Sequence, residues 1–302
     1  MPDLALSVTI ASWNTRKDLQ ECLQSLEAVR DEVAFEVIVV DNASTDGSPE
    51  MVESMFPWVR LLRLPINVYF TGAHNRALSM RNAPHAFLLN SDTVVHKGVL
   101  KTLLDFSFAN PGAGILGPKL LNPDGSLQFS CRRFPNPMAA LFRNTVLGRM
   151  FPNNKFTREY LMTDWPHEQC REVDWVSGAA MFVTSDAMAR VGYLDPNYFM
   201  YCEDVDWCFR VNKAGLKVMY VPQGAITHAI GRSTDQAAKK MLLRFHASML
   251  RFYRVNMLPE IVWPLRPFAY VGAAGALFLR ASMFIVKILI DEGTRRKEKR
   301  EP

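Results

Sequence analysis

Short apolar runs alternate with amphipathic segments through the first third of the chain. Four runs rich in β-branched and other apolar residues are typical of strands buried in a parallel sheet: Leu6–Ala11, Phe35–Val40, Val59–Leu64 and Ala86–Leu89. The segments between them show helical spacing or helix-capping residues, at 15–26, 49–55 and 72–81. This alternation predicts an α/β fold with a doubly wound, mostly parallel sheet and flanking helices.

The alternation breaks over residues 117–170, which are rich in Pro, Asn and Arg and predict hairpins and loops over the sheet. It resumes with a strand pattern at Val173–Val183, a helix at Ser185–Val191 and a strand at Lys217–Val221. The last of these lies in a strand-like run that ends at His228.

The end of the chain predicts two helices, a basic amphipathic one at Ala237–Asn256 and an apolar one at Pro267–Ile290. The second is long enough to span a membrane. Its cations, with Arg266 before it, fall on one stripe, which favours a helix lying in the membrane interface with its charges toward the headgroups. A helix packed on the protein body is the alternative.

Composition supports a globular chain with a membrane-directed tail. Hydrophobic residues make up 49% and charged residues 22%, which excludes a disordered protein. Residues 1–237 hold 22 Lys and Arg against 25 Asp and Glu, whereas residues 238–302 hold 13 against 5. Because the basic residues of the tail are interleaved with Leu, Phe and Met, they favour a membrane surface over nucleic acid as the partner.

The terminus and the cysteines place the protein in the cytoplasm, at the inner face of the membrane. The first apolar run has no basic segment before it, so it is interpreted as a strand and not as a signal peptide. The five cysteines are odd in number and show no CxxC spacing. A zinc site or disulfide framework is therefore not expected, and a reducing compartment fits.

The run FMYCEDVDWCFR places three acids, Glu203, Asp204 and Asp206, among aromatic and aliphatic residues. Such a cluster is either the start of a helix or a catalytic site. Adjacent carboxylates in an apolar setting repel each other and lose hydration, which raises at least one pKa toward the range of a general base. Glu203 and Asp204 are the candidates, while Asp206 suits a helix start paired with Arg210.

Other polar groups follow apolar runs. Asp92 ends AFLLNSD, where an acid can bind Mg²⁺ or Mn²⁺ bridging two phosphates, or can simply cap a turn. His228 is either a satisfied histidine or a ligand, and Arg232, in the loop after it, could pair with a diphosphate. Asp41 can accept a hydrogen bond from the imide N–H of uracil or thymine, or make an Asx turn and helix cap.

Two nucleotide-binding classes are excluded by their missing motifs. The loop after the second strand, VVDNASTDGS, contains no GxGxxG, which argues against a dinucleotide-dependent dehydrogenase. It contains no GxxxxGK[ST] either, which excludes the P-loop class.

Taken in order, several motifs resemble family 2 of the inverting, nucleotide-sugar-dependent glycosyltransferases, in particular its bacterial rhamnosyltransferase-like branch. These motifs are SVTIASWN, VVDNASTDGS, NxYFTGAHNRAL, FLLNSDT, GPKLLNPDGSLQ, VDWVSGAAMFV, the acidic run and VPQGAITH. The resemblance covers roughly residues 6–235. It implies a GT-A domain over 1–236, with a nucleotide-binding half at 1–116 and an acceptor-binding half at 117–236, followed by the basic helical tail 237–302.

The resemblance also implies roles for single residues. Asp204 would be the base, with Glu203 as its rival, and Asp92 and His228 would hold the metal, with Asn90 where many members carry the first acid of a DxD motif. The nucleotide would be bound by Ala11, Asn14, Asp41, Asn75 and Ser91. The donor sugar and acceptor would be lined by Asp174, Trp175, Gly178 and Arg232. The QxxRW motif of processive synthases is missing, which indicates addition of one sugar per encounter.

The expected reaction is a metal-dependent, inverting transfer of rhamnose or a similar sugar from a dTDP- or UDP-linked donor. The acceptor would be a glycan or a polyprenyl-diphosphate-linked sugar in cell-surface polysaccharide synthesis. A nucleotidyltransferase is an alternative, but it should carry a Gly-rich basic loop after the first strand, where SWNTRKDL has no glycine. An inactive nucleotide-binding scaffold is a second alternative, although retention of the acids argues against it.

Overall fold

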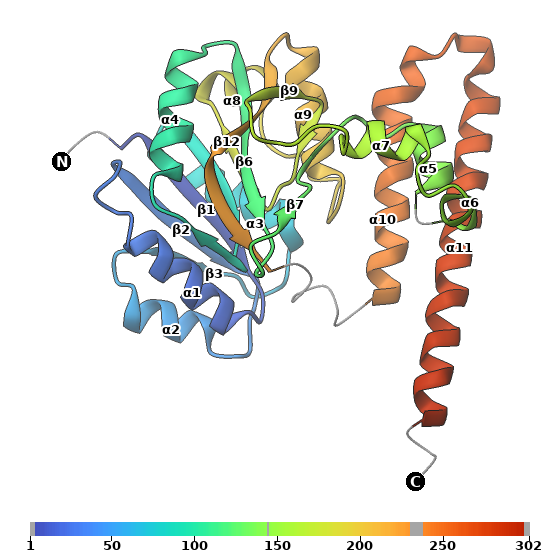
Figure 1. The fold of residues 1–302 in the computed structure, drawn as a ribbon. Coiled ribbons are helices and arrows are strands. Elements are labelled where there is room, and N and C mark those ends of the chain that lie inside the picture. Colours follow the sequence, from blue (N-terminus) through green and yellow to red (C-terminus); the bar gives the residue numbers. More distant parts are fainter. Residues whose placement is uncertain (1–3, 144, 230–237, 299–302) are drawn as a thin grey trace. The chain divides into compact units, whose positions relative to one another are not determined.

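The computed structural model describes residues 4–143, 145–229 and 238–298. The chain forms two compact units (Figure 1). The first comprises Met1–Asn197 and Glu203–Ser233, and the second comprises Tyr198–Cys202 and Thr234–Pro302.

The strands belong to the first unit. They are β1 Leu6–Ser12, β2 Phe35–Asp41, β3 Arg60–Arg63, β4 His85–Asn90, β5 Thr93–Val95, β6 Ala113–Leu121, β7 Leu127–Gln128, β8 Cys131–Arg132, β9 Arg171–Val173, β10 Trp175–Val176, β11 Ala180–Val183 and β12 Lys217–His228. Within the described residues, the main sheet has the order β3-β2-β1-β4-β11-β6-β12-β5. β8 and β10 form a separate antiparallel pair.

The helices of the first unit are α1 Arg16–Glu27, α2 Ser48–Met55, α3 Tyr69–Met80, α4 Val99–Ala109, α5 Pro137–Phe142, α6 Val146–Met150, α7 Lys155–Leu161, α8 Ser185–Val191 and α9 Glu203–Lys213. The second unit holds α10 Ala238–Phe252, three short helical turns between 253 and 265, and α11 Arg266–Glu298. The predicted strand–helix alternation over the first hundred residues is thus confirmed.

Parallel pairing places the ends of β1, β2 and β4 at one edge of the sheet. Ala11 of β1 is paired with Val40 of β2 on one side and with Asn90 of β4 on the other. Ser12 is paired with Asp41. The carboxyl ends of parallel strands, where α/β proteins bind ligands, therefore gather the first group of candidate residues.

The second half of the sheet is mixed. β11 runs antiparallel to both β4 and β6, while β12 is parallel to β6. β5 pairs antiparallel with the end of β12, so that His228 lies opposite Thr93. This pairing brings the end of β12 back to the turn that follows β4.

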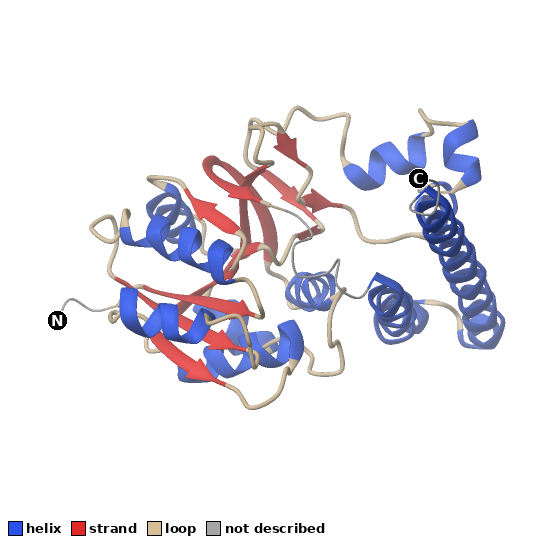
Figure 2. Ribbon diagram, turned by 90° about the horizontal axis from the view of Figure 1, so that it is seen from below, coloured by secondary structure: helices blue, strands red, loops and turns tan. Residues whose placement is uncertain are grey.

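Helices cover both faces of the sheet, as the alternation of β2 shows (Figure 2). Val37 and Val39 belong to the core that includes Leu19 and Leu23 of α1. Ile38 and Val40 instead pack with Ala73 and Ala77 of α3. Because successive strand residues point to opposite faces, a continuous apolar run is what a sheet covered on both sides requires.

The prediction of loops beginning at residue 117 is wrong for β6, which continues to Leu121 within the sheet. Its glycines conceal the strand signal because they allow close packing. A Cβ at Gly117 would lie 2.6 Å from Val176 Cγ1, and one at Gly114 would lie 2.7 Å from Val211 Cγ1. Glycine in a strand often marks such a close approach.

The same stretch contains three short helices that were not predicted, α5, α6 and α7. Their N-caps are Asn136, Thr145 and Asn154, whose side chains accept hydrogen bonds from the backbone N–H three residues later. The polar residues interpreted as loop formers are therefore helix caps. Such short helices carry too little periodic pattern to be recognised in the sequence.

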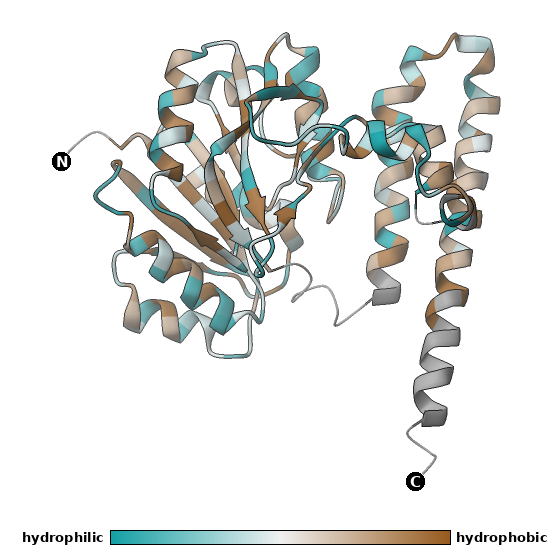
Figure 3. Ribbon diagram, viewed as in Figure 1, coloured by the Kyte–Doolittle hydropathy of each residue, from teal (hydrophilic) through white to brown (hydrophobic). Residues whose placement is uncertain are grey.

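The second unit contains the two helices predicted for the tail, and α10 and α11 lie antiparallel, side by side (Figure 1). Trp263–Val286 has the length and apolar composition needed to cross a bilayer, with 24 residues at a mean hydropathy of 1.6. Apolar residues occur along much of α11 (Figure 3). Several of its large apolar side chains are solvent-exposed: Phe268, Val271, Phe278, Leu279, Met283 and Val286.

Candidate active site

The acidic run forms the first turn of α9, and its two leading acids have different surroundings. Asp204 Oδ2 accepts a hydrogen bond from the backbone N–H of Gly178 at 3.1 Å, and Oδ1 accepts one from Val205 N at 2.8 Å. Glu203 is 6% exposed, and its buried Oε2 has no hydrogen-bond partner among the described residues. Asp204 is therefore held by two backbone donors, whereas one oxygen of Glu203 has no partner among the described residues.

These different surroundings affect the pKa values of the two acids differently. Burial raises the pKa of Glu203 well above its ordinary range, and the neighbouring charge of Asp204 raises it further. Burial also raises the pKa of Asp204, but its two backbone N–H bonds act in the opposite direction. The arrangement thus favours the proton on Glu203 and the negative charge on Asp204, whose pKa is raised in the sense that a general base needs.

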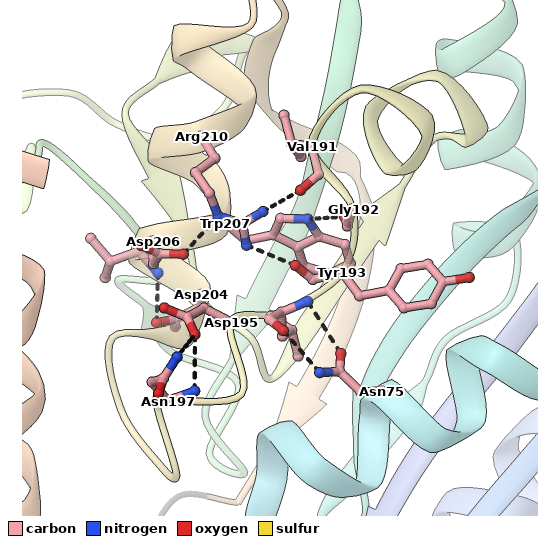
Figure 4. A network of polar contacts seen from close by, with 12 residues as sticks. Asn75, Val191, Gly192, Tyr193, Asp195, Asn197, Asp204, Asp206, Trp207 and Arg210 are labelled. Atoms are coloured by element: carbon pink, nitrogen blue, oxygen red, sulfur yellow. Dashed lines mark hydrogen bonds and ion pairs between the residues drawn. The ribbon is translucent and has the colours of Figure 1, made fainter. Parts of the chain in front are cut away.

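Asp206 has the structural role predicted for it. Its carboxylate forms an ion pair with Arg210 Nε at 2.8 Å and is almost completely buried. Arg210 also donates to the backbone carbonyls of Val191 and Tyr193, and Trp207 Nε1 donates to Gly192 O (Figure 4). These bonds tie α9 to the chain that follows α8.

Asn75 of α3 holds the continuation of the same chain. Its Nδ2 donates to Leu194 O at 2.8 Å, and its Oδ1 accepts from Leu194 N at 3.2 Å (Figure 4). Both ends of the amide that was predicted to bind the nucleotide are therefore engaged with backbone.

Asp92 and His228 are brought together at the sheet edge. His228 Nε2 lies 3.3 Å from Asp92 Oδ1 and also 3.3 Å from Asn90 Nδ2. On the other side of the ring, His228 Nδ1 lies 2.7 Å from Gln128 Oε1. Gln128 Nε2 in turn donates to His228 O and to Asn122 Oδ1, which assigns the orientation of the Gln128 amide.

This orientation has a chemical consequence for His228. Because Gln128 Oε1 can only accept, Nδ1 carries the ring proton. Nε2 is then the ring nitrogen that faces the carboxylate of Asp92, and these two atoms could act together as ligands of a cation. A carboxylate oxygen and an imidazole nitrogen both serve Mn²⁺, and the hydrogen bond to Gln128 is the outer-shell contact typical of ligating histidines.

The donor set is small. Among the described residues, no group of three or more His, Cys, Asp and Glu side chains is placed to hold a metal. Asp92 and His228 would thus supply two ligands, and the remaining positions would fall to phosphate oxygens and water, as is usual for Mg²⁺ at nucleotide sites.

The loops after β1 and β2 are bound to each other beside this edge. Asp41 is 3% exposed; Oδ2 accepts from Ser44 N at 2.9 Å, while Oδ1 is buried with no hydrogen-bond partner among the described residues. Asn14, at a positive φ of 52°, accepts from Thr45 N through Oδ1 at 2.8 Å. The Asx-type turn considered for Asp41 is therefore present, and one of its oxygens remains available.

Ser91 is also placed at this edge, between the first and fourth strands. Its Oγ accepts from Thr15 Oγ1 at 3.0 Å, and Thr15 Oγ1 lies 3.1 Å from Ser12 Oγ. Ala11 is paired with Asn90 in the sheet. The end of β1 therefore lies beside the turn that carries Asp92.

Of the residues predicted to line the donor and acceptor, only Gly178 contacts the acids. Asp174 accepts from Arg133 Nη1 at 3.0 Å and from Phe134 N at 2.6 Å, and Trp175 Nε1 donates to Arg133 O. Asp174 and Trp175 thus hold the chain after β8. Arg232 lies outside the described residues.

Gly178 leaves room for the base. A Cβ there would lie 3.4 Å from Asp204 Cβ and 3.3 Å from Phe70 Cζ. A glycine thus lets the backbone N–H approach the carboxylate closely.

Two further residues belong to the site and were not singled out from the sequence. Gln128 orients His228, and Arg132 stacks over Trp175 with its charge felt by Asp204. Gln128 is the last residue of GPKLLNPDGSLQ, so its position in an ordered motif was a usable signal. Arg132 lies in CRRFPNP, where neighbouring Arg and Pro residues indicate only a basic loop.

A mixed sheet with an acid–histidine pair at one strand edge and a half-buried acid at a helix start is what a GT-A type of transferase presents. The model of the family described as "Glycosyltransferase like family 2" matches residues 2–244. The chain belongs to this family and is a glycosyltransferase.

One relative covers nearly the whole protein. The N-acetylglucosaminyl-diphospho-decaprenol L-rhamnosyltransferase of Mycobacterium tuberculosis is 30% identical, over 97% of each chain. Among solved structures, S. aureus TarS 1–349 in complex with UDP has a TM-score of 0.54 at 16% identity, covering 91% of this chain and 80% of that one. GalNAc-T7 with UDP, GalNAc and Mn²⁺ has a TM-score of 0.57 at 14% identity, covering 76% and 44%. These two likenesses confirm the GT-A fold.

Proposed function

We propose that the enzyme transfers one L-rhamnosyl residue, or a closely similar sugar, from a dTDP- or UDP-linked donor to a sugar carried on a polyprenyl diphosphate. The observation that carries the proposal is the 30% identity over 97% of both chains to an enzyme named for this transfer. The product would enter cell-surface polysaccharide synthesis.

Asp204 is the base in this proposal. It accepts the proton of the acceptor hydroxyl as that oxygen bonds to the anomeric carbon and the bond to the nucleotide diphosphate breaks on the opposite face. The sugar is thereby inverted without a covalent intermediate. The hydrogen bond from Gly178 orients the carboxylate, and a neutral Glu203 leaves Asp204 as the charged member of the pair.

Asp92 and His228 would hold Mg²⁺ or Mn²⁺ in this scheme. When bound, the ion would neutralise charge on the departing diphosphate. Gln128 keeps His228 in the tautomer that offers Nε2. The structure of GalNAc-T7 with UDP, GalNAc and Mn²⁺ is consistent with this choice of metal within the fold.

The nucleotide is proposed to bind at the ends of β1, β2 and β4, within residues 1–116. Asp41 Oδ1, which is buried and has no hydrogen-bond partner in the part of the chain that the structure describes, would accept the imide N–H of uracil or thymine. Ala11, Asn14 and Ser91 would line the ribose and phosphate side, whereas Asn75 would act through its hold on Leu194. Residues 117–236 would receive the acceptor, and Arg232 would pair with the diphosphate.

The tail, residues 237–302, is proposed to hold the enzyme on the cytoplasmic face of the membrane, where a lipid-linked acceptor is presented. Exposed apolar side chains on α11 and a balance of 13 basic to 5 acidic residues after position 237 support an interfacial helix.

A donor panel tests this function. Purified enzyme with Mg²⁺ or Mn²⁺ is offered dTDP- and UDP-sugars together with N-acetylglucosaminyl diphosphate on a short prenyl chain, and the products are identified by mass and anomeric NMR. We expect one deoxyhexose added per acceptor, with inversion. Formation of a sugar nucleotide from a nucleoside triphosphate and a sugar 1-phosphate would support the nucleotidyltransferase instead. Donor binding without turnover on any acceptor would indicate a scaffold.

A further inference from the structure

The short β8–β10 pair joins the strand of Arg132 to the segment that binds Asp204. Arg132 is paired in register with Trp175, and the next contact along this pair is Ser177 N with Ser130 O at 2.8 Å. Gly178 follows directly and binds Asp204. The strand that carries Arg132 is thus fixed to the segment that holds the base.

The guanidinium of Arg132 is pre-positioned but incompletely paired. It stacks over the Trp175 ring, 5.0 Å from the centroid, and Nη2 makes a long hydrogen bond of 3.3 Å to Phe129 O. Its Nε is buried and has no hydrogen-bond partner among the described residues. A buried donor without a partner is costly, and the described part of the chain supplies no acceptor for this one.

We propose that Arg132 binds the diphosphate of the lipid-linked acceptor and so selects acceptors that carry one. This inference rests on the proposed function, because it takes the acceptor to be a sugar joined to a lipid through a diphosphate. A planar guanidinium can donate to two phosphate oxygens at once, which gives Arg an advantage over Lys at such a site.

The position of Arg132 favours the acceptor over the donor as the source of the phosphate. Its charge acts on Asp204, the group that receives the acceptor's proton, and partly offsets the burial that raises the pKa of this acid. The donor diphosphate is instead proposed to bind near Asp92 and His228. These residues are contacted by Gln128 of β7, the strand before β8. In the acceptor, the diphosphate is attached to the same hexose that presents the reacting hydroxyl. The hydroxyl at the base and the diphosphate are therefore separated by only one sugar ring, and a cation on the segment joined to the base could bind the diphosphate.

Two acceptors separate phosphate recognition from other effects. One is N-acetylglucosaminyl diphosphate on a short prenyl chain, and the other is an uncharged alkyl glycoside of the same sugar and chain length. For Arg132→Gln, the ratio of kcat/KM between the charged and uncharged acceptors should fall by about 10–100-fold, the reach of a charged hydrogen bond. Arg132→Lys keeps the charge but cannot make two parallel hydrogen bonds to phosphate. Its ratio should therefore lie between those of the wild type and Arg132→Gln.

Arg133→Gln is the matched control. It removes the same charge one residue along the chain, where the side chain pairs with Asp174, and should leave the ratio unchanged. An equal fall on both acceptors in Arg132→Gln would overturn the inference, because it would show that Arg132 acts through Asp204 or the fold. An unchanged ratio without any loss would overturn it as well.

A direct binding measurement keeps the inference testable apart from the proposed transfer. Inorganic pyrophosphate is titrated into the wild-type and Arg132→Gln proteins by calorimetry, with EDTA present to remove divalent cations. Weaker binding by about tenfold or more in the variant supports the site, and equal binding refutes it. If wild-type protein transfers sugar to neither acceptor but binds pyrophosphate through Arg132, the proposed function fails while the anion site stands.

Discussion

The backbone N–H of Gly178 donates a hydrogen bond to Asp204 Oδ2 at 3.1 Å. This contact joins two segments, the chain after β10 and the first turn of α9, at the atom that is proposed to accept a proton. It also distinguishes Asp204 from Glu203, whose Oε2 is buried and has no hydrogen-bond partner within residues 4–143, 145–229 and 238–298. The account of catalysis depends on this difference.

Enlarging Gly178 should disturb the base without unfolding the protein. In Gly178→Ala the new Cβ would lie 3.3 Å from Phe70 Cζ and 3.4 Å from Asp204 Cβ, so either Phe70 must give by a few tenths of an ångström or the Gly178 backbone must move, and with it the N–H that binds Asp204. We expect kcat to fall by about 10–100-fold, because misplacement of a reacting group is costly. Steady-state kinetics checks this. Gly112→Ala is the control, since a Cβ there meets nothing within 4 Å, and a fall of similar size in that variant would contradict the interpretation.

Glu203 should make stability depend on pH. Burial raises its pKa above the unfolded value, so the folded chain binds the proton more tightly and loses stability as pH rises above about 4.3, the ordinary pKa of glutamate. Glu203→Gln does not titrate. We therefore expect its stability advantage over the wild type to grow from pH 4.5 toward neutral pH in urea unfolding experiments. A gap that does not vary with pH would show that Glu203 is ionised in the folded state.

The metal site predicts graded losses. Asp92→Ala removes a direct ligand and should abolish the increase in nucleoside-diphosphate affinity that Mn²⁺ produces. Gln128→Ala removes only the partner of His228 Nδ1 and should weaken Mn²⁺ binding by about 10–100-fold. Calorimetry of diphosphate binding with and without Mn²⁺ measures both. Wild-type metal dependence in Asp92→Ala would remove this residue from the site.

The apolar face of α11 should control membrane binding. Phe268 and Phe278 are 77% and 76% exposed, and replacing both with Asp should reduce sedimentation with anionic vesicles at low salt. Ile66→Asp changes an equally apolar, 66% exposed residue of the first unit and should have no effect. Unchanged sedimentation of the double variant would show that α11 does not contact the membrane.

The sequence was informative where burial imposes a regular pattern. Continuous apolar runs such as that of β2 are required when both faces of a sheet are covered, so the strands of the first half could be predicted, together with the strand-end placement of Asp41 and Asp92. The continuation of β6 could not, because Gly114 and Gly117 are selected by contacts with Val211 and Val176 from distant elements. No local pattern records such contacts.

The candidate site shows the same limit. Asp92 contacts His228 because β5 and β12 are paired in the sheet. The side chain of Asn75 is bound by Leu194, which lies far along the chain. Sequence motifs located these residues but did not show what their side chains contact. Arg132 was missed because its setting arises from a two-residue strand pair that carries no periodicity.

The central claim is that Asp204 is the base, and single-turnover transfer by Asp204→Asn tests it most directly. Asparagine keeps the size of the side chain and an oxygen for Gly178 N–H but cannot take the proton. With donor and metal binding shown to persist, we expect transfer to fall by about 10²–10⁴-fold, and Glu203→Gln to cost clearly less. Near wild-type transfer by Asp204→Asn, with transfer lost in Glu203→Gln instead, would contradict the account and make Glu203 the base.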